Sequence, residues 1–116
     1  MALCMKLLAD EGFEVFDVHQ EGRGFDLLAR RKYEQRCVEV KGLQGGIEPG
    51  IMFESSEWLM AQQLREDYWI YVITDCATQP ILFGVYQNPV ESFGDNKRLI
   101  QRFQISATTL REALTP

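Results

Sequence analysis

The sequence has few of the residues that build disulfide frameworks or zinc sites. It holds three cysteines and one histidine in 116 residues, and no two of them lie at a ligand spacing such as Cys-x-x-Cys. An odd number of widely separated cysteines also argues against a set of structural disulfides. We therefore expect three reduced thiols and a cytoplasmic location, with no structural zinc.

Long apolar runs, internal repeats and low-complexity stretches are missing too. The apolar residues at 1–9 are interrupted by Lys6 and followed by Asp10, so they are too short for a membrane span and lack a signal-peptide pattern. With 46% hydrophobic and 25% charged residues, the composition is that of an ordinary globular protein. We expect one domain over residues 1–116 and no membrane association.

The chain as a whole lacks the excess of positive charge that nucleic-acid binding usually needs. Its net charge is −5. Residues 20–42 are an exception, because six basic and four acidic side chains give this segment a balance of +2, which leaves −7 for the rest. A charged, exposed hairpin would show the same pattern, so the segment is a candidate for phosphate contacts and no more.

Hydrophobic periodicity predicts both helices and strands. A helix at residues 2–10 ends at Gly12, and the near-continuous apolar run at 69–74 is typical of a central strand buried on both faces. A second helix is predicted from 57 to about 66, with Ser55 or Ser56 as its N-cap. The other predicted elements are strands at 13–18, 25–30, 36–41, 80–86 and 102–105, a short strand at 51–54, and a terminal helix at 108–114. The predicted class is α/β, with a mixed central sheet flanked by helices.

The predicted strands at residues 25–30 and 36–41 should form an antiparallel hairpin, because only a few residues join them. A two-residue loop at 32–33 would place Asp26 directly opposite Glu39, with Lys41 on the same face. A loop at 33–34 would instead place Asp26 opposite Lys41 and diagonal to Glu39. A loop one residue longer or shorter would turn Asp26 to the other face, and no Asn-Gly or Asp-Gly signal fixes the choice.

Two carboxylates and an ammonium group on one surface are the chemistry of a divalent-cation site. Neighbouring carboxylates repel each other unless a cation lies between them, and oxygen ligands suit Mg²⁺ or Mn²⁺. We predict Asp26 and Glu39 as metal ligands, the backbone carbonyl of Val40 as a third ligand, and Lys41 as the group that orients the attacking water. The competing interpretation is a surface hairpin whose charges are merely solvated.

Five motifs resemble those of the PD-(D/E)XK, or restriction-endonuclease-like, superfamily, and more narrowly the domain at the C-terminus of the plant protein NO VEIN and of many bacterial proteins, some with helicase domains. The resemblance spans about residues 11–89. The matching motifs are Gly24-Phe25-Asp26-Leu27, Val38-Glu39-Val40-Lys41-Gly42, Ser56-Glu57-Trp58 with Ala61, Asp67-Tyr68-Trp69-Ile70-Tyr71-Val72, and Gln87-Asn88-Pro89.

This resemblance implies a restriction-endonuclease-like fold, with Asp26, Glu39 and Lys41 as the catalytic residues. It also implies that the chain is a fragment or C-terminal domain of a longer protein, next to a helicase or another domain, and that it can act as a homodimer. Many members of the superfamily carry a further acidic residue on the first helix. Here Asp10 and Glu11 lie at the far end of that helix, so a two-metal version of the site is not supported.

Four further polar residues are weaker candidates. Arg23 is predicted to contact a phosphate, and Gln62 is predicted to face the nucleic acid from the second helix, with Gln63 as the alternative. Most helical glutamines face water, and Arg23 is equally a turn residue. His19 has no second histidine or cysteine at ligand spacing, which favours a surface role.

Two functions are therefore expected. The first is Mg²⁺-dependent hydrolysis of DNA by an endonuclease domain of a restriction, defence or repair protein; an RNase or tRNA-cleaving toxin would use the same motif. The second is an inactive module of the same fold that serves protein contacts or nucleic-acid docking. Replacing Lys41 by alanine should abolish cleavage but change the free energy of unfolding by less than about 0.5 kcal/mol, as expected for an exposed site.

Overall fold

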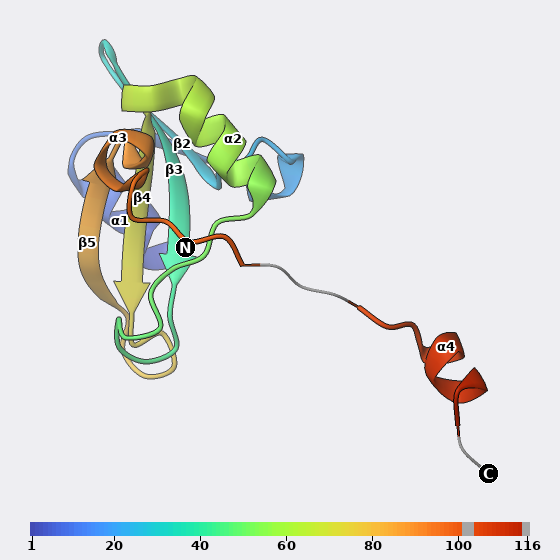
Figure 1. Cartoon of the computed structure of the whole chain (residues 1–116). Coiled ribbons are helices and arrows are strands. Elements are labelled where there is room, and N and C mark those ends of the chain that lie inside the picture. The colour runs from blue at the N-terminus through green and yellow to red at the C-terminus, as the bar shows by residue number, and fades with distance from the viewer. Residues whose placement is uncertain (101–103, 115–116) are drawn as a thin grey trace.

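The computed structural model describes residues 1–100 and 104–114 (Figure 1). Within these residues, five strands form one sheet, and four α-helices and two short 3₁₀ turns, η1 and η2, connect or flank them. In chain order the elements are α1 (Ala2–Asp10), β1 (Glu14–Asp17), η1 (His19–Glu21), β2 (Leu27–Arg31), β3 (Glu34–Gly42), α2 (Ser55–Leu64), η2 (Arg65–Asp67), β4 (Tyr68–Thr74), β5 (Ile81–Gln87), α3 (Pro89–Phe93) and α4 (Ala107–Glu112).

The sheet is mixed, and its strands follow one another in chain order, β1-β2-β3-β4-β5. Neighbouring strands run antiparallel except β3 and β4, which are parallel. A parallel pair needs a crossover connection, and α2 lies within it. The predicted α/β class with a mixed sheet flanked by helices is therefore confirmed.

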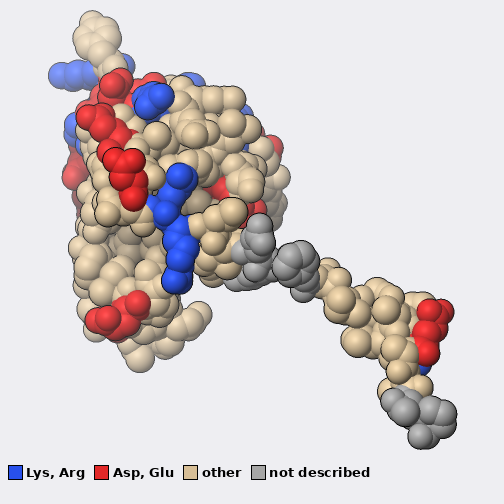
Figure 2. Space-filling model, viewed as in Figure 1, with Lys and Arg blue, Asp and Glu red and all other residues tan. Residues whose placement is uncertain are grey.

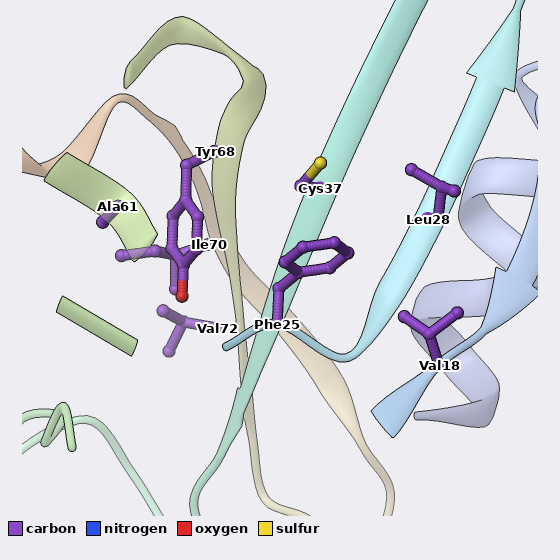
Figure 3. Close-up of a cluster of buried hydrophobic side chains, with 8 residues drawn as sticks. All are labelled: Val18, Phe25, Leu28, Cys37, Ala61, Tyr68, Ile70 and Val72. Atoms are coloured by element: carbon purple, nitrogen blue, oxygen red, sulfur yellow. The ribbon is translucent and has the colours of Figure 1, made fainter. Parts of the chain in front are cut away.

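Each face of the sheet packs its own core, and the alternation of side chains along the strands decides which residue joins which core. On one face α2 covers a cluster that includes Cys37 of β3 and Tyr68 and Ile70 of β4 (Figure 3). On the other face α1 contributes Cys4 and Leu8, one helical turn apart, to a second cluster. Figure 1 shows α1 and α2 on these opposite faces.

The hairpin of β2 and β3 adopts the first of the two predicted registers. Arg31 pairs with Glu34 and Leu27 pairs with Val38, so residues 32–33 form a two-residue loop. Lys32 has a φ of 49°, a left-handed conformation that costs a residue with a side chain some free energy. As predicted, Cys37 and Val38 face opposite cores.

Several predicted boundaries are wrong. Residues 51–54 form no strand, and β2 begins two residues later than expected. The N-cap of α2 is Glu54 instead of a serine, because Glu54 and Glu57 form a reciprocal capping box that the serines do not offer. The predicted strand at 102–105 falls partly outside the described residues, and Gln104 and Ile105 are not in a strand.

The C-terminal part of the chain holds two short helices. The sequence did not predict α3, which the buried Asn88 caps with its side chain, whereas α4 lies close to the predicted terminal helix. In Figure 1, α4 lies away from the sheet. Within the described residues, no helix has both the length and the apolar character needed to cross a membrane.

Candidate functional site

Asp26 and Glu39 are brought together by the β2–β3 hairpin. The Asp26 N–H donates to the Val38 carbonyl at 2.8 Å, although Val38 pairs with Leu27, so the ladder is irregular just before β2 begins. Asp26 and Glu39 nevertheless line the same cavity, beside the N-terminal end of α2. The Oδ2 atom of Asp26 accepts a hydrogen bond from the Val40 N–H at 2.9 Å. One carboxylate oxygen of Asp26 is thus fixed against β3.

Lys41 lies on the same face and joins two carboxylates. Its Nζ atom is 3.0 Å from Oε2 of Glu39 and 2.6 Å from Oε1 of Glu57, and it lies 4.9 Å from the centre of the Phe53 ring. The Lys41 side chain is 14% exposed, so these ion pairs are largely shielded from water. The expectation of an exposed lysine is therefore wrong, because α2 covers the end of β3.

The site residue that sequence reasoning did not single out is Glu57, at the N-terminal end of α2. Its Oε1 atom also accepts the Glu54 N–H at 2.9 Å, so the capping box holds its side chain in place. Residues 57, 60, 61 and 64 fall on one side of the helix, and Met60, Ala61 and Leu64 pack in the core. This helical spacing is the signal that could have placed Glu57 on the inner face.

Burial raises the pKa of Glu39 to about 8, because its charged form loses most of its hydration. The residue is only 4% exposed. The positive charge and hydrogen bond of Lys41 oppose the rise, whereas the negative charges of Asp26 and Glu57 add to it. A cation close to Glu39 would favour the ionised carboxylate.

Burial also acts on Lys41 and Glu57, but their mutual interaction outweighs it. Burial lowers the pKa of Lys41, yet its hydrogen bond with Glu57 and the charge of Glu39 raise this pKa more. Burial raises the pKa of Glu57, yet hydrogen bonds from Lys41 and from the Glu54 N–H lower it more. The two groups are therefore held as an ammonium and a carboxylate.

A cavity of about 170 Å³ opens beside these residues, between the η1 loop and the start of α2. It is lined by His19, Gly22, Arg23, Gly24, Phe25, Asp26, Glu39, Glu54, Ser56 and Glu57. Four of these residues are acidic, and Arg23 is paired with Glu21 at 2.7 Å. The cavity wall is thus predominantly negative, which suits a cation better than an anion.

The wall of the cavity depends on a close approach between Gly24 and α2. A Cβ atom at Gly24 would lie 2.8 Å from Cβ of Met60 and 3.1 Å from the Ser56 carbonyl oxygen, and the φ of Gly24 is +81°. The buried hydroxyl of Tyr68 donates to the Gly24 carbonyl at 2.8 Å. Glycine is therefore required here for both space and backbone conformation.

The structure brings some predicted residues to the cavity and leaves others away from it. Arg23 and His19 line it, although the His19 imidazole is hydrogen-bonded to Asp17. Gln62 and Gln63 are exposed on α2 and do not line the cavity, because the helix turns Glu57 and Met60 inward. The contact of one of these glutamines with nucleic acid stays a prediction.

The acidic residues at the end of α1 do not reach the site. Asp10 pairs with Lys6 at 3.4 Å, and Glu11 lies 3.7 Å from Arg36. Because α1 packs on the face of the sheet opposite α2, these carboxylates are separated from Glu39 by the sheet itself. The first helix therefore adds no ligand.

The donor chemistry of the site fits Mg²⁺ or Mn²⁺. Asp26 and Glu39 offer hard oxygen donors on one wall, and the crowding of carboxylates around Glu39 would be relieved by a divalent cation. Among residues 1–100 and 104–114, no three His, Cys, Asp or Glu side chains are arranged to hold a metal ion. Mg²⁺ is usually held by one or two carboxylates plus water and phosphate oxygens, so two carboxylates suffice.

These features define an α/β domain with a carboxylate–lysine site between a hairpin and a helix N-terminus. The family described as protein NO VEIN, C-terminal, matches residues 1–85, which is most of the chain, and the protein belongs to this family. The match begins at α1 and ends within β5, so it includes every residue of the site. Comparisons with curated proteins and with solved structures gave no match.

Proposed function

We propose that the domain hydrolyses phosphodiester bonds in DNA with Mg²⁺ or Mn²⁺, as a member of the PD-(D/E)XK superfamily. The observation that supports this most directly is that Asp26 and Glu39 line one cavity and that the Lys41 ammonium lies 3.0 Å from Glu39. Such a site needs both carboxylates at one point and a lysine beside them.

Each residue has a distinct role in the proposed reaction. Asp26, Glu39 and the Val40 carbonyl would hold the cation, which would lower the pKa of a bound water and offset phosphate charge when present. The Lys41 ammonium donates a hydrogen bond to the attacking water or to the phosphate oxygen on which charge develops. Arg23, at the mouth of the cavity, contacts a neighbouring phosphate.

The proposed substrate enters an acidic environment, so the cation and a few basic residues must offset its repulsion. Figure 2 shows basic side chains on one face as small groups among acidic and uncharged ones. Because the net charge is −5, we expect weak DNA binding without the cation. A further domain of a longer cytoplasmic chain, such as a helicase, or a second copy of the domain would supply the remaining affinity.

The test compares cleavage of supercoiled plasmid, linear duplex and single-stranded DNA in Mn²⁺, with chelator as the negative control. Wild-type protein should cut at least one DNA substrate, and Asp26→Asn and Lys41→Met should each lower the rate about a hundredfold or more. Asp95→Asn, which changes an exposed acidic residue away from the cavity, is the matched control and should retain the wild-type rate. Cleavage that survives Asp26→Asn would refute the proposal.

One observation favours the second function, an inactive module of the same fold. The Lys41 ammonium already lies between Glu39 and Glu57, so it neutralises the Glu39 carboxylate that a metal would otherwise bind. Calorimetry with Mg²⁺ and Mn²⁺ separates the two functions. Binding that Asp26→Asn abolishes supports the enzyme, whereas no binding at millimolar metal supports the module.

A further inference from the structure

The Lys41 ammonium is shared unequally between two carboxylates from different elements. It lies 2.6 Å from Glu57, on α2, and 3.0 Å from Glu39, its neighbour on β3. A lysine two residues from a carboxylate on the same strand can pair with it without help from any other element. The helix carboxylate is therefore the nearer of the two partners, although the ammonium contacts both.

Glu57 is well placed to hold the ammonium at a fixed point. Its Oε1 atom accepts hydrogen bonds from both Lys41 and the Glu54 N–H, at 2.6 and 2.9 Å. The capping box ties Glu57 to the first turn of α2, and Phe53, which precedes that turn, presents its ring to the ammonium at 4.9 Å. The position of Lys41 is thus set by the start of α2 as well as by β3.

The charge of the cluster also depends on Glu57. When Glu39 is ionised, Asp26, Glu39 and Lys41 alone carry a net charge of −1, and Glu57 changes this to −2. A net charge of −2 matches a divalent cation. Without Glu57, the ammonium would pair with Glu39 alone and compete with the cation for the same oxygens.

We propose that Glu57 is a positioning residue: as the nearer partner of the Lys41 ammonium, it takes up part of the positive charge that Glu39 would otherwise receive alone, which makes Glu39 more available to the divalent cation. This inference rests on the proposed function, since it concerns the same cation. It assigns Glu57 no contact with the cation or the substrate. Its effect on metal binding should therefore pass mainly through Lys41, beside the direct repulsion between Glu57 and Glu39.

The key variant is Glu57→Gln, because a capping box accepts glutamine as well as glutamate at this position. The helix start is retained while the charge that attracts Lys41 is lost. Glu54→Gln is the matched control: it removes a carboxylate from the same helix end and the same cavity, but Glu54 has no contact with Lys41 among the described interactions. Mn²⁺ affinity is measured by calorimetry, and urea unfolding confirms that each variant is folded.

We expect Glu57→Gln to weaken Mn²⁺ binding about tenfold or more, as loss of a residue that orients a metal ligand commonly does, and Glu54→Gln to change it less than about threefold. In a Lys41→Met background, Glu57→Gln should have a much smaller effect, because no ammonium remains to be redirected. Three results would overturn the inference while the proposed function stands. They are an unchanged Mn²⁺ affinity in Glu57→Gln, a loss of affinity in Glu54→Gln equal to that in Glu57→Gln, and a loss on Glu57→Gln that is as large in the Lys41→Met background as in the wild type. Absence of Mn²⁺ binding by the wild type would overturn both.

Discussion

The pKa of Glu39 makes the stability of the metal-free protein depend on pH. The pKa of the Glu39 carboxyl group is about 8 in the folded protein and has its ordinary value of 4.5 in the unfolded chain. Between these pH values, the folded protein therefore binds more protons than the unfolded chain does. Its contribution to stability is complete below pH 4.5 and is lost as the pH rises through 8. Stability should therefore fall across this window.

The size of the effect follows from the two pKa values. Integrating the difference in bound protons from pH 5 to pH 8 gives a loss of about 3 kcal/mol in the free energy of unfolding. Glu57, whose pKa is lowered, changes stability mainly below pH 4.5, so it contributes little in this range. For a domain with a typical stability of roughly 5–15 kcal/mol, such a loss is readily measured.

The comparison is between the wild type and Glu39→Gln, whose carboxamide imitates the protonated carboxyl group at every pH. Urea unfolding is followed by the fluorescence of Trp58 and Trp69 in chelator from pH 5 to pH 8.5. We expect similar stabilities near pH 5 and a Gln variant that is more stable by about 3 kcal/mol at pH 8. A wild-type stability that stays level across this range, or an equal slope in Glu39→Gln, would show that Glu39 is not buried as described.

Two further predictions concern the packing of the site. Replacing Lys41 by methionine should destabilise the fold by about 2–4 kcal/mol, because Glu39 and Glu57 lose the ammonium that they share. Urea unfolding measures the change. In the control, Lys6→Met, the side chain is 74% exposed, so the free energy of unfolding should stay within about 0.5 kcal/mol of the wild type. An unchanged stability in Lys41→Met would mean that the ion pairs are solvated. Replacing Gly24 by alanine should lower the free energy of unfolding by about 2 kcal/mol or more, because the backbone has a positive φ and the new Cβ would collide with Met60. Gly22 also has a positive φ but has open space around it, so Gly22→Ala should cost about 1 kcal/mol. Equal costs for the two variants would exclude the steric contribution at Gly24.

The sequence predicted the hairpin well, but it could not choose between two registers. Both registers put Asp26 and Lys41 on one face, and nothing at Lys32 or Tyr33 marks a particular turn. The structure adopts the register whose loop requires Lys32 in a left-handed conformation. Residue preferences disfavour that choice, so packing of Leu28 and Cys37 in the core must outweigh the local cost.

The role of α2 was predicted less well, because the rotation of a short helix about its axis depends on a few residues. Serine is a favoured N-cap, but the Glu54–Glu57 capping box begins the helix one residue earlier than Ser55 would. The prediction that Gln62 or Gln63 faces the site followed from the resemblance to relatives that carry a polar residue on this helix. The spacing of Met60, Ala61 and Leu64 is the better guide, since it fixes the buried side of the helix.

The sheet keeps the two cores apart, and this separation bears on how the domain tolerates substitution. The cluster under α1 and the cluster under α2 share no residue, and the site lies with α2. Changes beneath α1, at Cys4 or Leu8, can therefore alter the fraction of molecules that are folded without altering the arrangement of charges in the folded ones. Substitutions on the α1 side should accordingly affect the stability of the domain more than the geometry of the carboxylate–lysine site.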